Sequence, residues 1–178
     1  MNRRRFVIGT TAVGGIAIAG GATLLLRPRT SGDLTLNAVA ENLESFRGKQ
    51  LLSHGKWSAA HIFSHNAQSI NYSMAGFPKK KGPVFQTLLG KPAFAVFSAW
   101  GEMHHGLAEP IPGAYAIEDD IPLDSAIDEL LASIAIFTAY TDALKPHFAY
   151  GELNKADYES AHVLHFLNHM REITVQSV

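Results

Sequence analysis

The sequence of 178 residues contains no cysteine. This absence excludes a disulfide framework, a thiolate zinc site and a cysteine nucleophile. Three further signatures are missing from the sequence: a glycine-rich phosphate loop that opens a helix, a G-x-S-x-G nucleophile elbow, and an H-E-x-x-H zinc motif. The sequence therefore gives no support to nucleotide binding or to the hydrolase classes that depend on these motifs.

The net charge is only −1, but the charge is distributed unevenly. Residues 1–30 contain five of the 15 Lys and Arg residues and none of the 16 acids. Residues 31–178 therefore carry a formal charge of −6. A domain with this negative charge repels the phosphate backbone of nucleic acids, so we expect no nucleic-acid partner.

The first 30 residues have the features of an export signal. Three arginines precede residues 6–26, a stretch of 21 residues without charge. As a helix this stretch spans about 30 Å, the thickness of a bilayer core. The segment Asn2-Arg3-Arg4-Arg5-Phe6 resembles the twin-arginine export motif. The resemblance implies the twin-arginine machinery as a partner and a location on the periplasmic side of the bacterial inner membrane.

The sequence does not decide whether this segment is cleaved or is retained as a membrane anchor. Ala17-Ile18-Ala19 offers a site for signal cleavage, but the apolar sequence continues to Leu26. Without cleavage, residues 6–26 would anchor the protein in the inner membrane, and an ordinary anchor with a basic cytoplasmic flank fits equally well. We therefore expect a signal or anchor over residues 1–30 and one functional domain over residues 31–178.

Apolar spacing in residues 31–178 is typical of helices, and no sustained alternation of period two predicts a strand. Ser58 and Asn154 have the positions of helix N-caps, and the glycine- and proline-rich residues 101–122 predict a long connection. We expect an all-α fold, most simply an antiparallel four-helix bundle with an inserted loop. The predicted helices cover residues 35–47, 58–75, 84–100 with a break at Pro92, 124–144 and 155–174.

Histidines are the most informative residues of this chain. His61 and His65 are four residues apart on one predicted helix, and His165 and His169 repeat the spacing on another. Residues four apart share a helix face, so each pair can present two imidazoles to one ion. A pair with one histidine from a neighbouring helix makes a three-nitrogen site with an open position. Single buried histidines are more often structural, so spacing alone leaves both interpretations open.

Short motifs on the same helices resemble the DinB-like superfamily. The first group comprises Trp57-Ser58, His65 and Ser73-x-x-Gly76-x-Pro78. The second group, His147-Phe148-x-x-Gly151-x-Leu153 followed by His165-x-x-x-His169-x-Arg171, is similar to the end of an uncharacterised branch of that superfamily. The likeness covers about residues 34–175.

The resemblance implies a four-helix bundle that holds a divalent transition metal, zinc, nickel or iron, on His65, His165 and His169. His61 is the main competitor for a ligand position. His162 lies outside the motif, and we expect it near the ligands or at the surface. Asn168 stands where the branch pattern has another histidine, and this change would loosen the orientation of the ligands without removing the site.

Some members of the superfamily are thiol-dependent transferases or isomerases. A divalent ion on three neutral ligands would also acidify bound water, so we expect a metal-dependent thiol transferase or hydrolase that acts on an unidentified small molecule. No acid or base partner is evident in the sequence. Of the nearby acids, Glu172 lies one turn beyond His169, where it could face the site, and Glu102 and Glu109 belong to the loop; acids in such positions are more often solvated charges.

The alternative is a non-enzymatic exported bundle that binds a small molecule or a protein partner, and a homodimer is also open. We expect His104 and His105 to be exposed, unless their loop folds over the mouth of the bundle.

Overall fold

The computed structural model describes residues 34–176. This domain is mostly helical, with five helices of 10 to 17 residues. The predicted signal or anchor lies outside the described residues. Within residues 34–176, no helix has the length and apolar character needed to cross a membrane. The five helices are α2 (Leu36–Ser45), α3 (Ala59–Ala75), α5 (Lys91–Trp100), α6 (Leu123–Ala139) and α7 (Lys155–Met170).

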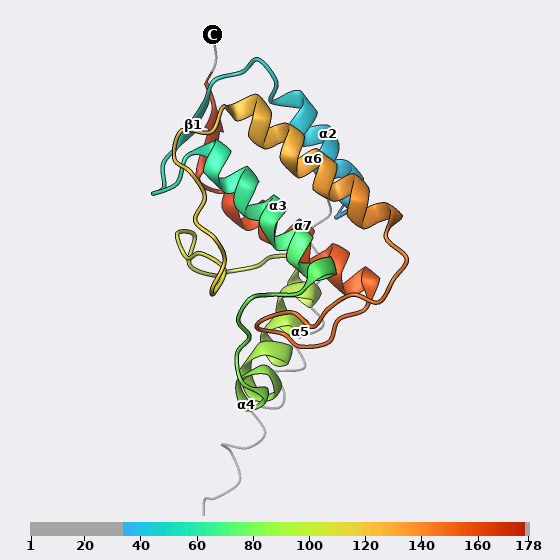
Figure 1. Ribbon diagram of the computed structural model, residues 1–178. Helices are drawn as coiled ribbons and strands as arrows, with labels where there is room; N and C mark the ends of the chain where they lie inside the picture. Colours follow the sequence, from blue (N-terminus) through green and yellow to red (C-terminus); the bar gives the residue numbers. More distant parts are fainter. Residues whose placement is uncertain (1–33, 177–178) are drawn as a thin grey trace, which may run out of the picture.

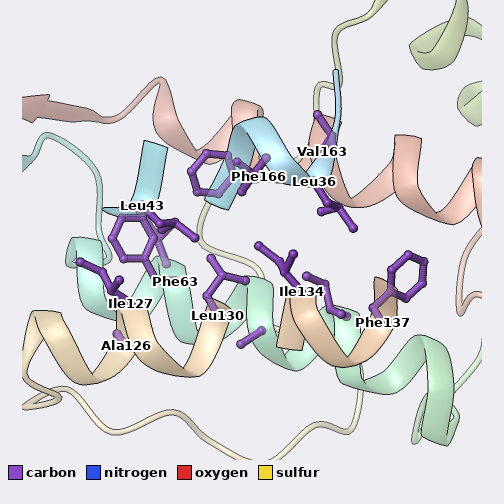
Figure 2. Packing of buried hydrophobic residues seen from close by; sticks show 14 of the residues in the cluster. Leu36, Leu43, Phe63, Ala126, Ile127, Leu130, Ile134, Phe137, Val163 and Phe166 are labelled. Carbon is purple, nitrogen blue, oxygen red and sulfur yellow. The ribbon is translucent and has the colours of Figure 1, made fainter. Parts of the chain in front are cut away.

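Four of these helices surround one apolar core. Helix α3 packs along α6 and also contacts α7, and α2 contacts both α6 and α7 (Figure 1). Side chains from all four helices point into the common interior, as Leu43, Phe63 and Phe166 show in Figure 2. Removal of these apolar side chains from water is the main force that holds the helices together.

The two predicted N-caps are confirmed. The Ser58 hydroxyl accepts the backbone N–H of His61 at 3.1 Å, and the Asn154 side chain accepts that of Asp157 at 2.9 Å. Each cap satisfies a backbone donor that the first helical turn leaves unpaired. The caps therefore determine where α3 and α7, the two helices that carry the histidine pairs, begin.

The predicted helix over residues 84–100 consists of three pieces: α4 (Pro83–Phe85), the π-helical turn η1 (Gln86–Gly90) and α5. Pro92 lies in the first turn of α5, where a missing N–H costs nothing. The irregularity expected at Pro92 is therefore a change from π-helix to α-helix at Lys91, and the backbone stays helical through it. In Figure 1 this segment, drawn in light green, extends past the ends of the packed helices.

The expectation of a purely helical domain is wrong in one respect. Strands β1 (Leu51–Ser53) and β2 (Ile173–Val175) pair antiparallel, with Leu51 opposite Val175. The last helix therefore ends at Met170 rather than at residue 174. Three-residue strands are too short to show alternation, and their pairing joins segments more than 100 residues apart, so the sequence pattern could not reveal them.

Helix α6 is also shorter than predicted, because it ends at Ala139 and not at residue 144. The ammonium group of Lys155 donates to the carbonyls of Thr138 and Tyr140, both at 2.7 Å. This contact satisfies carbonyls that the end of a helix leaves free. The contact that satisfies the end of α6 comes from a residue of α7, so the local sequence does not signal where α6 ends.

The expected long connection over residues 101–122 is confirmed.

Candidate metal centre

Three histidines from two helices meet at one point. His65 comes from α3, and His165 and His169 come from α7. The Nε2 atom of His165 lies 3.2 Å from Nε2 of His65 and 3.1 Å from Nε2 of His169. One ligand atom from each residue lies within 4.8 Å of the other two. We call these three residues the histidine triplet.

The spacing of the triplet fits a metal ion. Zinc–nitrogen bonds of about 2.0–2.1 Å in tetrahedral geometry separate two ligand nitrogens by about 3.3 Å. Hydrogen bonding alone does not suit the arrangement, because a neutral imidazole nitrogen carries either one hydrogen or one lone pair. Nε2 of His165 therefore cannot pair well with both neighbours, whereas a cation can accept a lone pair from all three.

The protonation of the triplet favours the same conclusion. Burial, with a smaller contribution from the neighbouring imidazoles, lowers the pKa of His65 to about 4 and that of His169 to about 3. Burial, together with the other histidines, also holds the pKa of His165 well below its ordinary value. All three rings are neutral near pH 7, which is the form that binds metal ions.

The indole of Trp57 forms one wall of the triplet. Its ring stacks on His169 with centroids 5.8 Å apart and is tilted against His65 at 4.9 Å. It also stacks on His61 at 4.6 Å. Trp57 belongs to the motif that suggested the family resemblance, but the sequence did not predict its contact with the ligands.

His61 and His162 do not belong to the triplet. The Nδ1 atom of His61 lies 3.7 Å from a carboxylate oxygen of Asp119. His162 is buried in the interior, where its ring contacts Phe137 and Tyr158. His162 is therefore a core residue and not a surface one.

The Nδ1 atoms of His65 and His169 are buried and find no hydrogen-bond partner among residues 34–176. Metal-binding histidines usually donate this second N–H to a carboxylate or a carbonyl. Asn168 is buried as well, and its amide nitrogen has no partner within the same described part of the chain. Ring packing, above all on Trp57, is what orients these two imidazoles.

A cavity of about 340 Å³ opens beside the triplet. His65 and His165 form part of its lining, together with the apolar side chains of Met103, Ile111 and Phe148. Lys81 and Glu109 are the charged residues that line it. A small molecule in this cavity would therefore lie against two residues of the triplet.

Of the three candidate acids, only Glu109 lines this cavity. Glu102 is exposed and lies 3.6 Å from His104. The carboxylate of Glu172 packs against Gly55. The expectation of exposure holds for His104, whereas His105 is half-buried and lines the cavity, so the loop does reach the mouth of the bundle.

Residues 32–176 match the model of a family described as a protein of unknown function, DUF1569. The chain belongs to this family. DUF1569 is a DinB-like branch, so the resemblance found in the short motifs is confirmed at the level of the family. The chain matches no curated protein and no solved structure. The histidine triplet of this DUF1569 domain is thus the observation from which a function can be argued.

Proposed function

We propose that this DUF1569 protein binds a divalent transition metal, zinc, nickel or iron, through His65, His165 and His169. The observation that carries the proposal is the convergence of three neutral Nε2 atoms at 3.1 and 3.2 Å. Neutral imidazoles are suitable ligands for all three of these metals. Three protein ligands are typical of catalytic rather than structural zinc sites, because they leave a position for a further ligand.

We further propose that the protein is a metal-dependent enzyme, a thiol transferase or a hydrolase, acting on a small molecule in the cavity. A divalent ion held by three neutral ligands supplies a strong Lewis acid that favours the ionised form of a thiol or of water. The chain's own contribution is the apolar wall of Met103, Ile111 and Phe148, which excludes water. Glu109 supplies the carboxylate that can accept a proton there.

A second candidate is a binding protein without catalysis. The mainly apolar lining of the cavity supports it, because such a lining is typical of small-molecule binding sites. Turnover distinguishes the two candidates. The metal-loaded protein should convert a thiol or ester substrate if it is an enzyme, and only bind the molecule if it is not.

The location of the protein is part of the proposal. The arginine-rich start and the uncharged residues 6–26 support export by the twin-arginine machinery to the periplasmic side of the inner membrane. Residues 6–26 would remain as the anchor if they are not cleaved. We assign α2, α3, α6 and α7 to the antiparallel four-helix bundle of the DinB-like superfamily.

Elemental analysis tests the metal site. The full-length protein, purified without a histidine tag, is expected to hold about one equivalent of a transition metal by plasma mass spectrometry. The triple variant H65A/H165A/H169A should hold none while it keeps its helical circular dichroism. His54→Ala removes an exposed histidine whose ring contacts Thr174, and it serves as the matched control that keeps the metal.

The single variant His61→Ala addresses the competing ligand. Because His61 faces Asp119 rather than the triplet, its loss should leave the metal content unchanged. A wild-type protein that stays metal-free after incubation with zinc, nickel and iron(II) would refute the proposed function.

A further inference from the structure

The segment formed by α4 and η1 exposes an unusual number of apolar side chains. Among residues 34–176, nine large apolar side chains are exposed, and four of them lie within residues 84–89. These four are Val84, Phe85, Leu88 and Leu89, and we call them the apolar patch. Val84 and Leu88 are 71% and 67% exposed, more than any other large apolar side chain of the described residues. Apolar side chains gathered in this way mark a surface that binds a partner.

The opposite side of the same segment is already occupied. The Gln86 side chain donates to two carbonyls of the loop after α6, at 3.3 and 3.4 Å. Gly90, four residues later, is buried against this loop. Residues two apart on a helix point to nearly opposite sides, so Val84 and Leu88 lie on the side that faces away from the loop. The loop therefore fixes the segment and leaves the patch uncovered.

Positive charge surrounds the patch. Residues 76–101 contain four lysines and none of the 16 acids of the chain. Lys79, Lys80 and Lys81 precede the patch, Lys91 follows it, and all four are exposed. The ammonium group of Lys81 lies 5.5 Å from the centroid of the Phe85 ring. This region is thus locally basic in a domain whose formal charge is −6.

An apolar patch bordered by lysines is complementary to a lipid bilayer with anionic headgroups. The boundary between headgroups and acyl chains accepts the apolar side chains, and the lipid phosphates attract the ammonium groups. A two-fold contact between copies of the chain would instead bring the same positive charges together. The charge distribution therefore favours a membrane over a second copy as the partner of this surface.

The start of the described chain lies at the same end of the helices. The backbone N–H of Leu36 donates to the carboxylate of Glu159 at 3.2 Å, in the second turn of α7. Helix α7 follows directly after the loop against which Gly90 packs. Only residues 27–33 separate this part of the domain from the uncharged residues 6–26, a distance of at most about 25 Å. The proposed anchor would thus hold the end of the domain that carries the patch close to the membrane.

We infer that the apolar patch and the lysines beside it bind the surface of an anionic lipid bilayer, with Val84 and Leu88 inserted between the headgroups. The inference goes beyond the proposed metal function and does not depend on it. Lys81 and Phe85 also line the cavity beside the triplet. Docking of the patch would therefore place part of the cavity wall at the lipid interface.

The test uses the full-length protein reconstituted into vesicles, with a fluorescent label as a local reporter of depth. Because the chain has no cysteine, Leu88→Cys provides a single position for a label whose emission depends on polarity. Ile136→Cys is the matched control, because Ile136 is 56% exposed on α6, outside the patch. The vesicles contain phosphatidylcholine alone or mixed with phosphatidylglycerol, and a nitroxide on the lipid acyl chain quenches any label that enters the bilayer.

In vesicles with phosphatidylglycerol, we expect the label at position 88 to shift its emission to the blue and to be quenched. The label at position 136 should show neither change. K79E/K80E should lower the ratio of docked to undocked molecules, read from the quenched fraction, at least about tenfold, because two attractive charges become repulsive. The control K49E/K56E makes the same charge change at the exposed lysines that flank β1, and it should leave docking unchanged.

Absence of quenching at position 88 overturns the inference, and so does unchanged docking of K79E/K80E. Equal quenching at positions 88 and 136 overturns it too, because residues outside the patch would then hold the domain at the bilayer. A blue shift at position 88 that grows with protein density, without quenching by the nitroxide, would assign the patch to a second copy and would also overturn it.

Val84→Cys repeats the measurement within the patch if the Leu88→Cys protein does not fold. None of these results depends on the metal content of the protein. Failure of the membrane inference and failure of the proposed metal site are therefore distinguished by separate measurements.

Discussion

Trp57 contacts both helices that supply the histidine triplet, since its indole packs on His65 and on His169. The Nδ1 atoms of these two histidines have no hydrogen-bond partner among the residues described. In most metal sites such hydrogen bonds hold the ligand rings in place. Here the indole performs that role by packing alone.

Replacement of Trp57 by alanine should therefore weaken metal binding by about tenfold, the lower range for a lost orienting contact. Trp57→Phe keeps an aromatic ring, so its metal affinity should be closer to that of the wild type. The measurement is the zinc dissociation constant in competition with a chromophoric chelator. Equal zinc affinity in wild type and Trp57→Ala would show that the indole does not orient the ligands.

His147 illustrates a different use of an imidazole in the same protein. Its Nδ1 accepts the backbone N–H groups of Ala149 and Tyr150 at 3.2 and 3.1 Å, and its ring stacks on Tyr150 at 4.3 Å. Nδ1 must be unprotonated to accept these bonds. Burial lowers the pKa of His147 to about 3, in agreement with this geometry.

This histidine should make the protein sensitive to acid. Between about pH 6.5 and pH 3 the unfolded chain binds a proton at His147 and the folded chain does not, so the free energy of unfolding falls as the pH falls. The expected slope is about 1 kcal/mol per pH unit from this residue, and it fades as the pH rises above about 6.5. Urea unfolding across this range measures the slope.

The matched variant is His147→Asn, whose side-chain oxygen can accept the same N–H groups without titrating. Its stability should depend less on pH than that of the wild type by about the stated slope. Identical pH profiles for the two proteins would mean that His147 takes up its proton without unfolding.

At the scale of elements, the π-helical turn η1 brings its last residue, Gly90, against the loop that follows α6. A β-carbon at Gly90 would collide with the backbone carbonyl oxygen of Ala149. Backbone atoms cannot turn aside as a long side chain can. Any residue other than glycine must push η1 away from the loop that carries His147.

Gly90→Ala should therefore lower the free energy of unfolding by about 2 kcal/mol or more, as overpacking against a fixed group does. Gly82→Ala is the control in the same segment, because a β-carbon at Gly82 would meet no atom within 4 Å. Chemical denaturation compares the two variants. A Gly90→Ala protein as stable as Gly82→Ala would show that the loop can move away.

The sequence predicted the beginnings of α3 and α7 because their signals are local. Ser58 and Asn154 are N-caps, and the periodic apolar residues follow at once. The strands β1 and β2 and the end of α6 depend on contacts with distant residues, so no local pattern could show them. The π-helical turn likewise depends on packing against residues 145–153.

The same distinction holds for the candidate site. The four-residue spacing and the family motifs were sufficient to select the triplet, because a helix fixes which residues share a face. The place of His105 depends on the path of a long connection, and the His104-His105 doublet gave no means to tell the two residues apart. The role of Trp57 required knowledge of how α3 lies against α7.

At the scale of the whole molecule, metal binding should stabilise the fold. A ligand that binds only the folded state raises the free energy of unfolding by about 2.7 kcal/mol at a free concentration 100 times its dissociation constant. We expect zinc to raise the melting temperature of the wild type and to leave H65A/H165A/H169A unchanged. An equal shift in both proteins would indicate binding at other histidines.

The triplet joins residues that are 100 positions apart in the sequence, His65 and His165. A metal ion at this point would be a reversible cross-link in a chain that has no cysteine and so no disulfide to do the same. It would close most of the domain into a loop, from α3 through α6 to α7. Opening that loop requires the release of at least one imidazole, so the presence of metal would determine how long a single molecule stays folded.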